Sequence, residues 1–268
     1  MTRLHVRHTT TYAFDGGPTS GLQQVRKWPK SGNGQIVHNW STEITGGKVE
    51  LSYEDHHNNR IELLSFTSGV DELTIVSDGE VEVEDQAGVV GPHRATAPLW
   101  LYSRPTRLTK AGTGIRSVMK EAAGDAPLHR LHSLMEVISS KVTYEVGASH
   151  PDWTAEEALA EGKGVCQDHS HVFIAAAREM GHPARYVSGY LMLDDRVEQD
   201  AMHAWAEAYI NDLGWVGFDA SNGISPDARY VRVATGLDYR DAAPVRGVRS
   251  GQAVEALTVE IEVAEQNQ

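Results

Sequence analysis

The stretch GKGVCQDHSH, residues 162–171, holds Cys166, which is the only cysteine in the 268 residues of the chain. Two glycines, Gly162 and Gly164, precede it, and an apolar run with helical spacing follows directly. This pattern predicts a helix that begins at Cys166 and ends before Gly181, preceded by a loop that a substrate backbone can approach closely. A thiol on the first turn of a helix is either a small buried apolar side chain or a nucleophile whose thiolate the positive helix end favours.

The composition predicts a chain that builds its own hydrophobic core. Its length is ample for one large or two modest domains, and its single cysteine cannot form an internal disulfide. The 24 Lys and Arg against 37 Asp and Glu give a formal net charge of −13, which argues against nucleic acid or an anionic membrane as the main partner. No segment has the apolar pattern of a membrane span or a secretory signal. We therefore expect a cytoplasmic protein, and homo-oligomerisation stays open.

Residues 1–100 alternate apolar and polar side chains and are rich in β-branched residues. Gly, Asp and Asn separate the alternating segments at short intervals, which predicts an antiparallel sheet or sandwich. Three prolines then interrupt the pattern within residues 88–106. We therefore predict a β-rich N-terminal domain over 1–100 and a second domain over 101–268.

The second domain begins with helical patterns and continues with strand patterns. Thr154 and Glu157 form a capping box, which predicts a short helix before the helix that begins at Cys166. Helices are also predicted at 114–124 and 126–142, and strands at 184–193, 203–210, 215–219 and, near the C-terminus, 256–265. Helices followed by consecutive strands predict an α+β class, with helices packed on an antiparallel sheet.

His203 and Asp219 are the candidate partners of Cys166. A nucleophilic cysteine needs an imidazole to take its proton, and the imidazole needs a third group that fixes its orientation. His203 opens one predicted strand, and Asp219 closes the next, across the tight turn NDLG. A hairpin places these two ends at one edge of the sheet, and a helix packed on the sheet can bring Cys166 to the same edge.

Three blocks of sequence resemble the core motifs of the transglutaminase-like superfamily. They are GKGVCQDHSHVFIAAAREMGHPARYVSGYL at 162–191, HAWAEAYI at 203–210 and GWVGFDASNG at 214–223. HTTTYAF and DHHNNRIELLSF also resemble the β-rich N-terminal domain of the bacterial branch of this superfamily. The resemblance implies a papain-like core with a Cys-His-Asp triad at Cys166, His203 and Asp219.

Four further residues are candidates for the site, and for Tyr144 and Gln167 the resemblance implies the role. Tyr144 is the candidate for a second oxyanion donor beside the Cys166 N–H, with a core aromatic of a strand as the alternative. Gln167 is expected to orient groups around the same oxyanion. Trp205 and Asn222 are the expected substrate-binding residues, with sheet packing as the alternative for Trp205.

Two short segments depart from the family pattern, and two pairs of histidines are candidates for metal binding. The chain has DASN at 219–222 where relatives often carry Asp-Pro-Thr-Asn, and His169 and Ser170 where relatives often carry an aromatic and a small residue. His169 and His171 are two residues apart on a predicted helix, so they point to different faces and are not expected to share a metal. Adjacent histidines in DHHNN, residues 55–59, have poor metal-ligand geometry. No metal and no cofactor are therefore expected.

The triad that the resemblance implies supports acyl transfer through a thioester. We expect a cysteine hydrolase, a peptidase or amidase, that acts on peptide, isopeptide or γ-glutamyl-type amide bonds. The alternatives are a protein-crosslinking amine transferase and a peptide-binding scaffold without activity.

Overall fold

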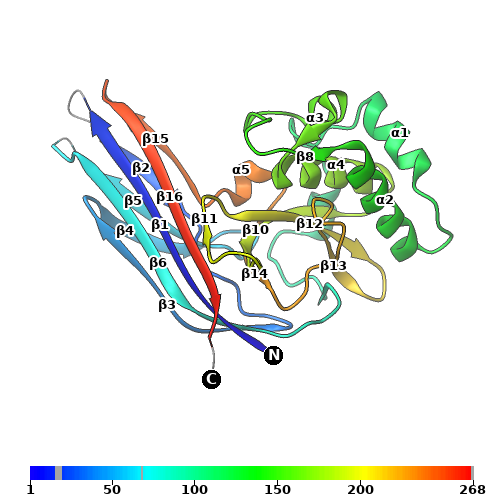
Figure 1. Ribbon diagram of the computed structural model, residues 1–268, viewed down its shortest axis with the longest axis horizontal. Coiled ribbons are helices and arrows are strands. Elements are labelled where there is room, and N and C mark those ends of the chain that lie inside the picture. Colours follow the sequence, from blue (N-terminus) through cyan, green and yellow to red (C-terminus); the bar gives the residue numbers. More distant parts are fainter. Residues whose placement is uncertain (16–19, 68, 267–268) are drawn as a thin grey trace.

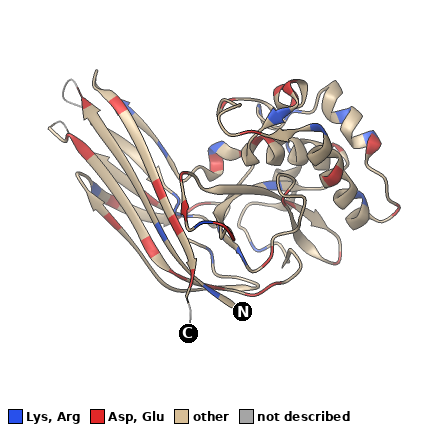
Figure 2. Ribbon diagram, viewed as in Figure 1, with Lys and Arg blue, Asp and Glu red and all other residues tan. Residues whose placement is uncertain are grey.

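The computed structural model describes residues 1–15, 20–67 and 69–266. A β-sandwich lies beside a core of helices packed on a sheet, which confirms the predicted α+β class (Figure 1). Within these ranges, no helix combines the length and the apolar character needed to cross a lipid bilayer. Acidic side chains occur in both parts, with Lys and Arg between them, so the excess negative charge is spread over the molecule (Figure 2).

The sandwich consists of two antiparallel sheets. One runs in the order β11 (Glu198–Gln199), β16 (Val254–Glu265), β1 (Thr2–Asp15), β6 (Glu72–Val83), β3 (Gln35–Thr45). The other runs in the order β15 (Val245–Ser250), β2 (Ser20–Val25), β5 (Arg60–Phe66), β4 (Lys48–Glu54). Buried and less buried residues alternate along β1 and β6, as the sequence pattern predicts for strands with one buried face.

The long strand β1 contributes to two separate hydrophobic clusters. Tyr12 and Phe14, near its end, pack between the two sheets of the sandwich. Leu4 and Val6, near its start, belong to the large cluster that also contains the core residues Val172 and Tyr190. One face of β1 thus contributes side chains both to the interior of the sandwich and to its junction with the core.

The sheet of the core has five strands, in the order β14 (Tyr230–Gly236), β10 (Ala184–Leu191), β12 (His203–Ile210), β13 (Gly214–Phe218), β7 (Val89–Gly91). Its helices are η1 (Leu99–Ser103), α1 (Thr113–Glu121), α2 (Pro127–Lys141), α3 (Ala155–Glu161), α4 (Cys166–Glu179) and α5 (Tyr239–Ala242). A short parallel pair, β8 (Thr143–Tyr144) and β9 (Lys163–Gly164), joins the end of α2 to the start of α4. Helix α4 is buried over most of its length, because it packs against both β12 and the other helices.

Strand pairings cross the predicted division at residue 100 in both directions. The predicted C-terminal strand lies within β16, but β16 pairs with β1 along nearly its whole length, so it extends the sandwich and not the core. In the opposite direction, β7 precedes residue 100 and pairs with β13 in the core sheet. Local sequence patterns identify a strand but not the strand with which it pairs. For this reason the C-terminal strand was expected to belong to the core.

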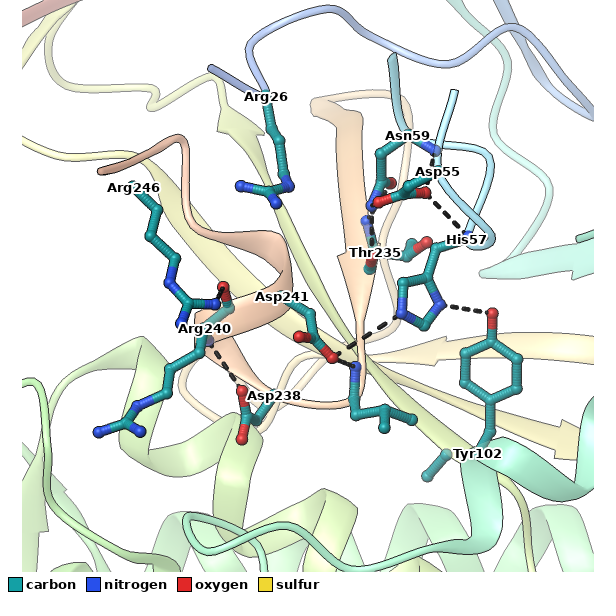
Figure 3. Close-up of polar contacts among 12 residues, drawn as sticks. Arg26, Asp55, His57, Asn59, Tyr102, Thr235, Asp238, Arg240, Asp241 and Arg246 are labelled. Atoms are coloured by element: carbon teal, nitrogen blue, oxygen red, sulfur yellow. Dashed lines mark hydrogen bonds and ion pairs between the residues drawn. The ribbon is translucent and has the colours of Figure 1, made fainter. Parts of the chain in front are cut away.

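The DHHNN motif joins the sandwich to the core (Figure 3). The amide of Asn59 accepts a hydrogen bond of 2.8 Å from the Thr235 N–H and donates one of 2.7 Å to the Thr235 carbonyl. Nδ1 of His57 lies 2.8 Å from the Tyr102 hydroxyl, and Asp55 accepts hydrogen bonds from the backbone N–H groups of His57 and Asn59. The motif therefore holds a turn of the sandwich against β14.

A chain of buried polar side chains makes a second connection. Lys27 donates a hydrogen bond to the Thr10 hydroxyl, which lies 3.1 Å from Nε2 of His8. Nδ1 of His8 lies 3.0 Å from the hydroxyl of Tyr190, on β10 of the core. Burial lowers the pKa of Lys27 from 10.5 to about 7.

Replacing Lys27 by Met is expected to remove a pH dependence of stability. Since the pKa of Lys27 lies near 7 in the folded protein and at 10.5 in the unfolded chain, the unfolded chain binds more protons between these values. Stability should therefore rise with pH across this window, by on the order of 4 kcal/mol from this group. Urea unfolding of the wild type and K27M at several pH values measures the difference.

The exposed Lys110 offers a matched control, because K110M should keep the wild-type slope. If K27M shows the same dependence of unfolding free energy on pH as K110M, then the Lys27 amine is not responsible for it.

Candidate active site

Cys166 occupies the first position of α4, so its backbone N–H is free of the helical hydrogen bonds. Asp168 fixes this start, since its Oδ2 accepts a hydrogen bond of 2.8 Å from the Val165 N–H. Gly164 gives Asp168 the space it needs, because a Cβ built on Gly164 would lie 2.7 Å from the Asp168 Cβ. Gly164 is itself buried, so its role is to fit Asp168 and not to admit a substrate backbone.

Gly162 has a different local role. It ends α3 in the left-handed conformation, with φ of 66°, and its N–H donates to the Ala158 carbonyl. The capping box predicted at Thr154 and Glu157 is present at the other end of this helix. Helix α3 is thus fixed at both ends, which sets the direction in which β9 enters α4.

The hairpin of β12 and β13 brings His203 and Asp219 into contact, as the sequence predicts. Their ladder ends with Ala206 opposite Phe218, and the two side chains meet just beyond it. Nε2 of His203 donates to Oδ2 of Asp219 over 2.6 Å. This leaves Nδ1 as the ring nitrogen for another partner.

Asp219 is buried but surrounded by donors. Its Oδ2 accepts from His203, from the Asn222 amide at 2.7 Å and from the Tyr230 hydroxyl at 2.8 Å. Its Oδ1 accepts from the Ser221 N–H at 3.0 Å and the Ser221 hydroxyl at 2.6 Å. Burial alone would raise the pKa of this carboxyl, but the hydrogen bonds and the His203 charge lower it to about 2.

His203 also interacts with Cys166. Burial alone would lower the pKa of the ring, but its hydrogen bonds to Asp219 and to the Cys166 sulfur raise the pKa above the ordinary value of 6.5. The His203 ring thus lies between the Cys166 sulfur and the Asp219 carboxylate. The structure brings together the three residues of the predicted triad.

Tyr144 and Gln167, the two further candidates for the oxyanion site, have different surroundings. Tyr144 is half-exposed on β8, and burial together with the nearby Cys166 and Asp219 charges raises the pKa of its hydroxyl. Its hydroxyl is thus a protonated donor near the sulfur. Gln167 instead donates from Nε2 to the Pro151 carbonyl at 3.0 Å, which ties α4 to the preceding loop.

Trp205 and Asn222 both contact the His203–Asp219 pair. The Trp205 ring is 2 % exposed and stacks on His203 at 6.2 Å between ring centroids, which agrees with the packing alternative for this residue. The Asn222 amide donates a hydrogen bond to Asp219. Tyr230, which also packs edge-on against His203, was not identified from the sequence, because it comes from β14, beyond the hairpin.

The two histidines on α4 are held separately. His169 contacts two backbone carbonyls, and Nε2 of His171 accepts a hydrogen bond of 3.1 Å from the Tyr239 N–H. Burial, with a smaller effect from Arg178, lowers the pKa of His171 to about 3. Across residues 1–15, 20–67 and 69–266, no three His, Cys, Asp or Glu side chains are arranged to hold a metal ion.

Comparison with known families agrees with this geometry. Residues 116–220 match the transglutaminase-like superfamily, and residues 4–82 match the bacterial transglutaminase-like N-terminal region. The chain thus combines a transglutaminase-like core region with a bacterial transglutaminase-like N-terminal region. The two matches confirm the resemblance of both the core and the β-rich N-terminal part, and Cys166 and His203 lie within the core match.

Proteins similar to this chain over most of their length are found in mycobacteria. An uncharacterized protein of Mycobacterium leprae is 28% identical over 277 residues, which cover 98% of this chain and 99% of the relative. An uncharacterized protein of Mycobacterium tuberculosis is 29% identical over 275 residues, covering 92% and 87%. A crystal structure of a candidate cysteine protease from Cytophaga hutchinsonii is 22% identical, with a TM-score of 0.79 over 100% of this chain and 91% of that one. This likeness confirms a transglutaminase-like fold.

The D219N variant is expected to lower the pKa of His203. The carboxylate that stabilises the imidazolium is then neutral, while burial of the ring still opposes its charge. A decrease of about one pH unit or more should follow. An NMR titration of the His203 ring protons measures it. The exposed Asp195 gives the control D195N, and equal His203 titrations in D219N and D195N would show that Asp219 does not set the ring's charge.

Proposed function

We propose that this chain is a cysteine hydrolase that cleaves amide bonds through Cys166, His203 and Asp219. One observation carries the proposal: the only thiol of the chain lies at the start of a helix and interacts with a histidine whose Nε2 donates a hydrogen bond of 2.6 Å to a buried carboxylate. A nucleophile, a base and an orienting acid in this order are the parts of a thiol acyl-transfer site.

In the first half of the reaction, the proton of the Cys166 thiol passes to Nδ1 of His203. The thiolate then attacks the amide carbonyl carbon, a C–S bond forms, and the carbonyl oxygen becomes an oxyanion. The imidazolium gives its proton to the amide nitrogen, the C–N bond breaks, and an amine leaves. Asp219 keeps the ring oriented and stabilises its charge throughout.

The second half releases the acyl group. His203 takes a proton from water, the hydroxide oxygen attacks the thioester carbon, and the C–S bond breaks. A carboxylic acid leaves, and the proton returns to the Cys166 sulfur. A primary amine could take the place of water, and the product would then be a new amide.

The free N–H of Cys166 and the hydroxyl of Tyr144 are the proposed oxyanion donors. The first belongs to the nucleophile itself; Tyr144 is accessible to a bound carbonyl and close enough for the Cys166 charge to raise its pKa. The half-exposed Tyr144 and the partly exposed Cys166 leave the thioester open to water. This openness favours hydrolysis of peptide, isopeptide or γ-glutamyl-type amides over transfer to an amine.

Cys166 is expected to react with iodoacetamide at neutral pH at least about ten times faster than N-acetylcysteine, because His203 accepts its proton. The H203A variant should lose most of this advantage. H129A, at an exposed position of α2, is the matched control and should react like the wild type. A wild-type rate equal to that of N-acetylcysteine, with no effect of H203A, would refute the triad.

Hydrolysis and amine transfer are separated by their products. Dimethylated casein, whose lysines are blocked, is incubated with and without the amine putrescine. Mass spectrometry then measures the masses of the products. We expect new carboxylic acids in both reactions and a loss of activity of about 10³-fold in C166S. Putrescine adducts as the main product would favour the transferase. A reactive Cys166 with neither product would favour the peptide-binding scaffold for this class of substrate.

A further inference from the structure

His169 makes an unusual pair of contacts one helical turn after Val165. Its ring is 1 % exposed, Nδ1 lies 2.9 Å from the Val165 carbonyl oxygen, and Nε2 lies 2.9 Å from the Val142 carbonyl oxygen. A carbonyl oxygen can only accept a hydrogen bond. Both contacts are therefore hydrogen bonds only when the ring carries a proton on each nitrogen.

One of the two carbonyls belongs to the peptide group that supplies the first proposed oxyanion donor, and the other belongs to the start of β8. The Val165 carbonyl shares its peptide group with the N–H of Cys166, the first proposed oxyanion donor. The Val142 carbonyl shares its peptide group with the N–H of Thr143, which donates 2.9 Å to the Gly162 carbonyl. One imidazole ring thus connects the segment that carries Cys166 with β8, the segment that carries the second proposed donor.

A hydrogen bond to a peptide oxygen strengthens the N–H of the same peptide group as a donor, because the group is polarised along its length. The bond from Nδ1 of His169 therefore favours a stronger hydrogen bond from the Cys166 N–H to an oxyanion. The bond from Nε2 supports the contact between Thr143 and Gly162, which holds β8 beside β9. Phenylalanine, which has no donor, could fill the same space without either effect.

We propose that His169 is a positioning residue for acyl transfer, whose doubly protonated ring fixes and polarises the peptide group that supplies the Cys166 oxyanion donor. This role rests on the proposed function, since it requires an oxyanion to form beside Cys166. The charged or titratable groups around the ring are Asp168 and Cys166 on α4 and Tyr144 on β8, whose ring lies 6.2 Å from that of His169 between centroids. Burial raises the pKa of the Asp168 carboxyl, and the neighbouring His169 acts in the opposite direction.

The protonation of His169 can be measured without any substrate. Long-range proton–nitrogen NMR correlation of histidine-labelled wild type, assigned with H169Q, should show one ring protonated on both nitrogens near neutral pH, with slowly exchanging protons. A neutral His169 ring with a single proton would overturn the proposal, because one of the two carbonyl contacts would then not be a hydrogen bond.

The effect on the oxyanion is measured by two reactions of the same thiol. p-Nitrophenyl acetate acylates Cys166 through an oxyanion, whereas iodoacetamide alkylates it without one, and both require the thiolate. The ratio of the two rates therefore isolates the oxyanion contribution. We expect the ratio to fall about tenfold in H169F and to recover in part in H169Q, which keeps an amide donor. H129Q, at the exposed α2 position, should leave the ratio unchanged.

The outcomes separate this proposal from the proposed function. A fast wild-type alkylation with an unchanged ratio in folded H169F overturns the role of His169 and leaves the triad intact. If both rates fall equally in H169F, the residue serves only the general structure, and the proposal is wrong. A wild-type alkylation no faster than that of N-acetylcysteine refutes the hydrolase itself, and the oxyanion role with it.

Discussion

Asp219 has to stay ionised although it is almost fully buried. Several elements at this edge of the sheet donate hydrogen bonds to its carboxylate. A buried carboxylate without partners would be neutral, and a neutral acid could not hold an imidazolium. The donors come from three directions: His203 on β12, the turn that follows β13, and Tyr230 on β14. The charge on Asp219 therefore depends on how the core sheet brings β12, β14 and the turn after β13 together.

The turn after β13 holds Asp219 without a proline at position 220, where the family resemblance implies one. The Ser139 hydroxyl donates 2.5 Å to the Ala220 carbonyl, and the backbone N–H of Ser221 donates to Asp219. Hydrogen bonds from α2 and from the turn itself thus fix the position of this turn.

Cys166, His203 and Asp219 could be predicted because each sits next to a local signal: a helix start, a strand start and a strand end joined by a tight turn. Tyr230 could not be predicted, since its contact with Asp219 depends on the pairing of β14 with β10, which no local pattern specifies. The same reason applies to β16, whose strand pattern is clear but whose partner, β1, lies at the opposite end of the sequence. The bonds of His169 were also missed, because its acceptors are backbone carbonyls, which every residue has.

The pairing of β1 with β16 has a consequence for synthesis on the ribosome. Strand β1 leaves the exit tunnel long before its partner β16 has been made, and its start packs against core residues that are made in between. Pairing of such distant segments is slow, and an unpaired β1 edge exposes backbone groups to other strands in the meantime. The sandwich and the core are thus expected to reach their final form together, so that a chain interrupted before β16 would carry the candidate site on an unfinished support.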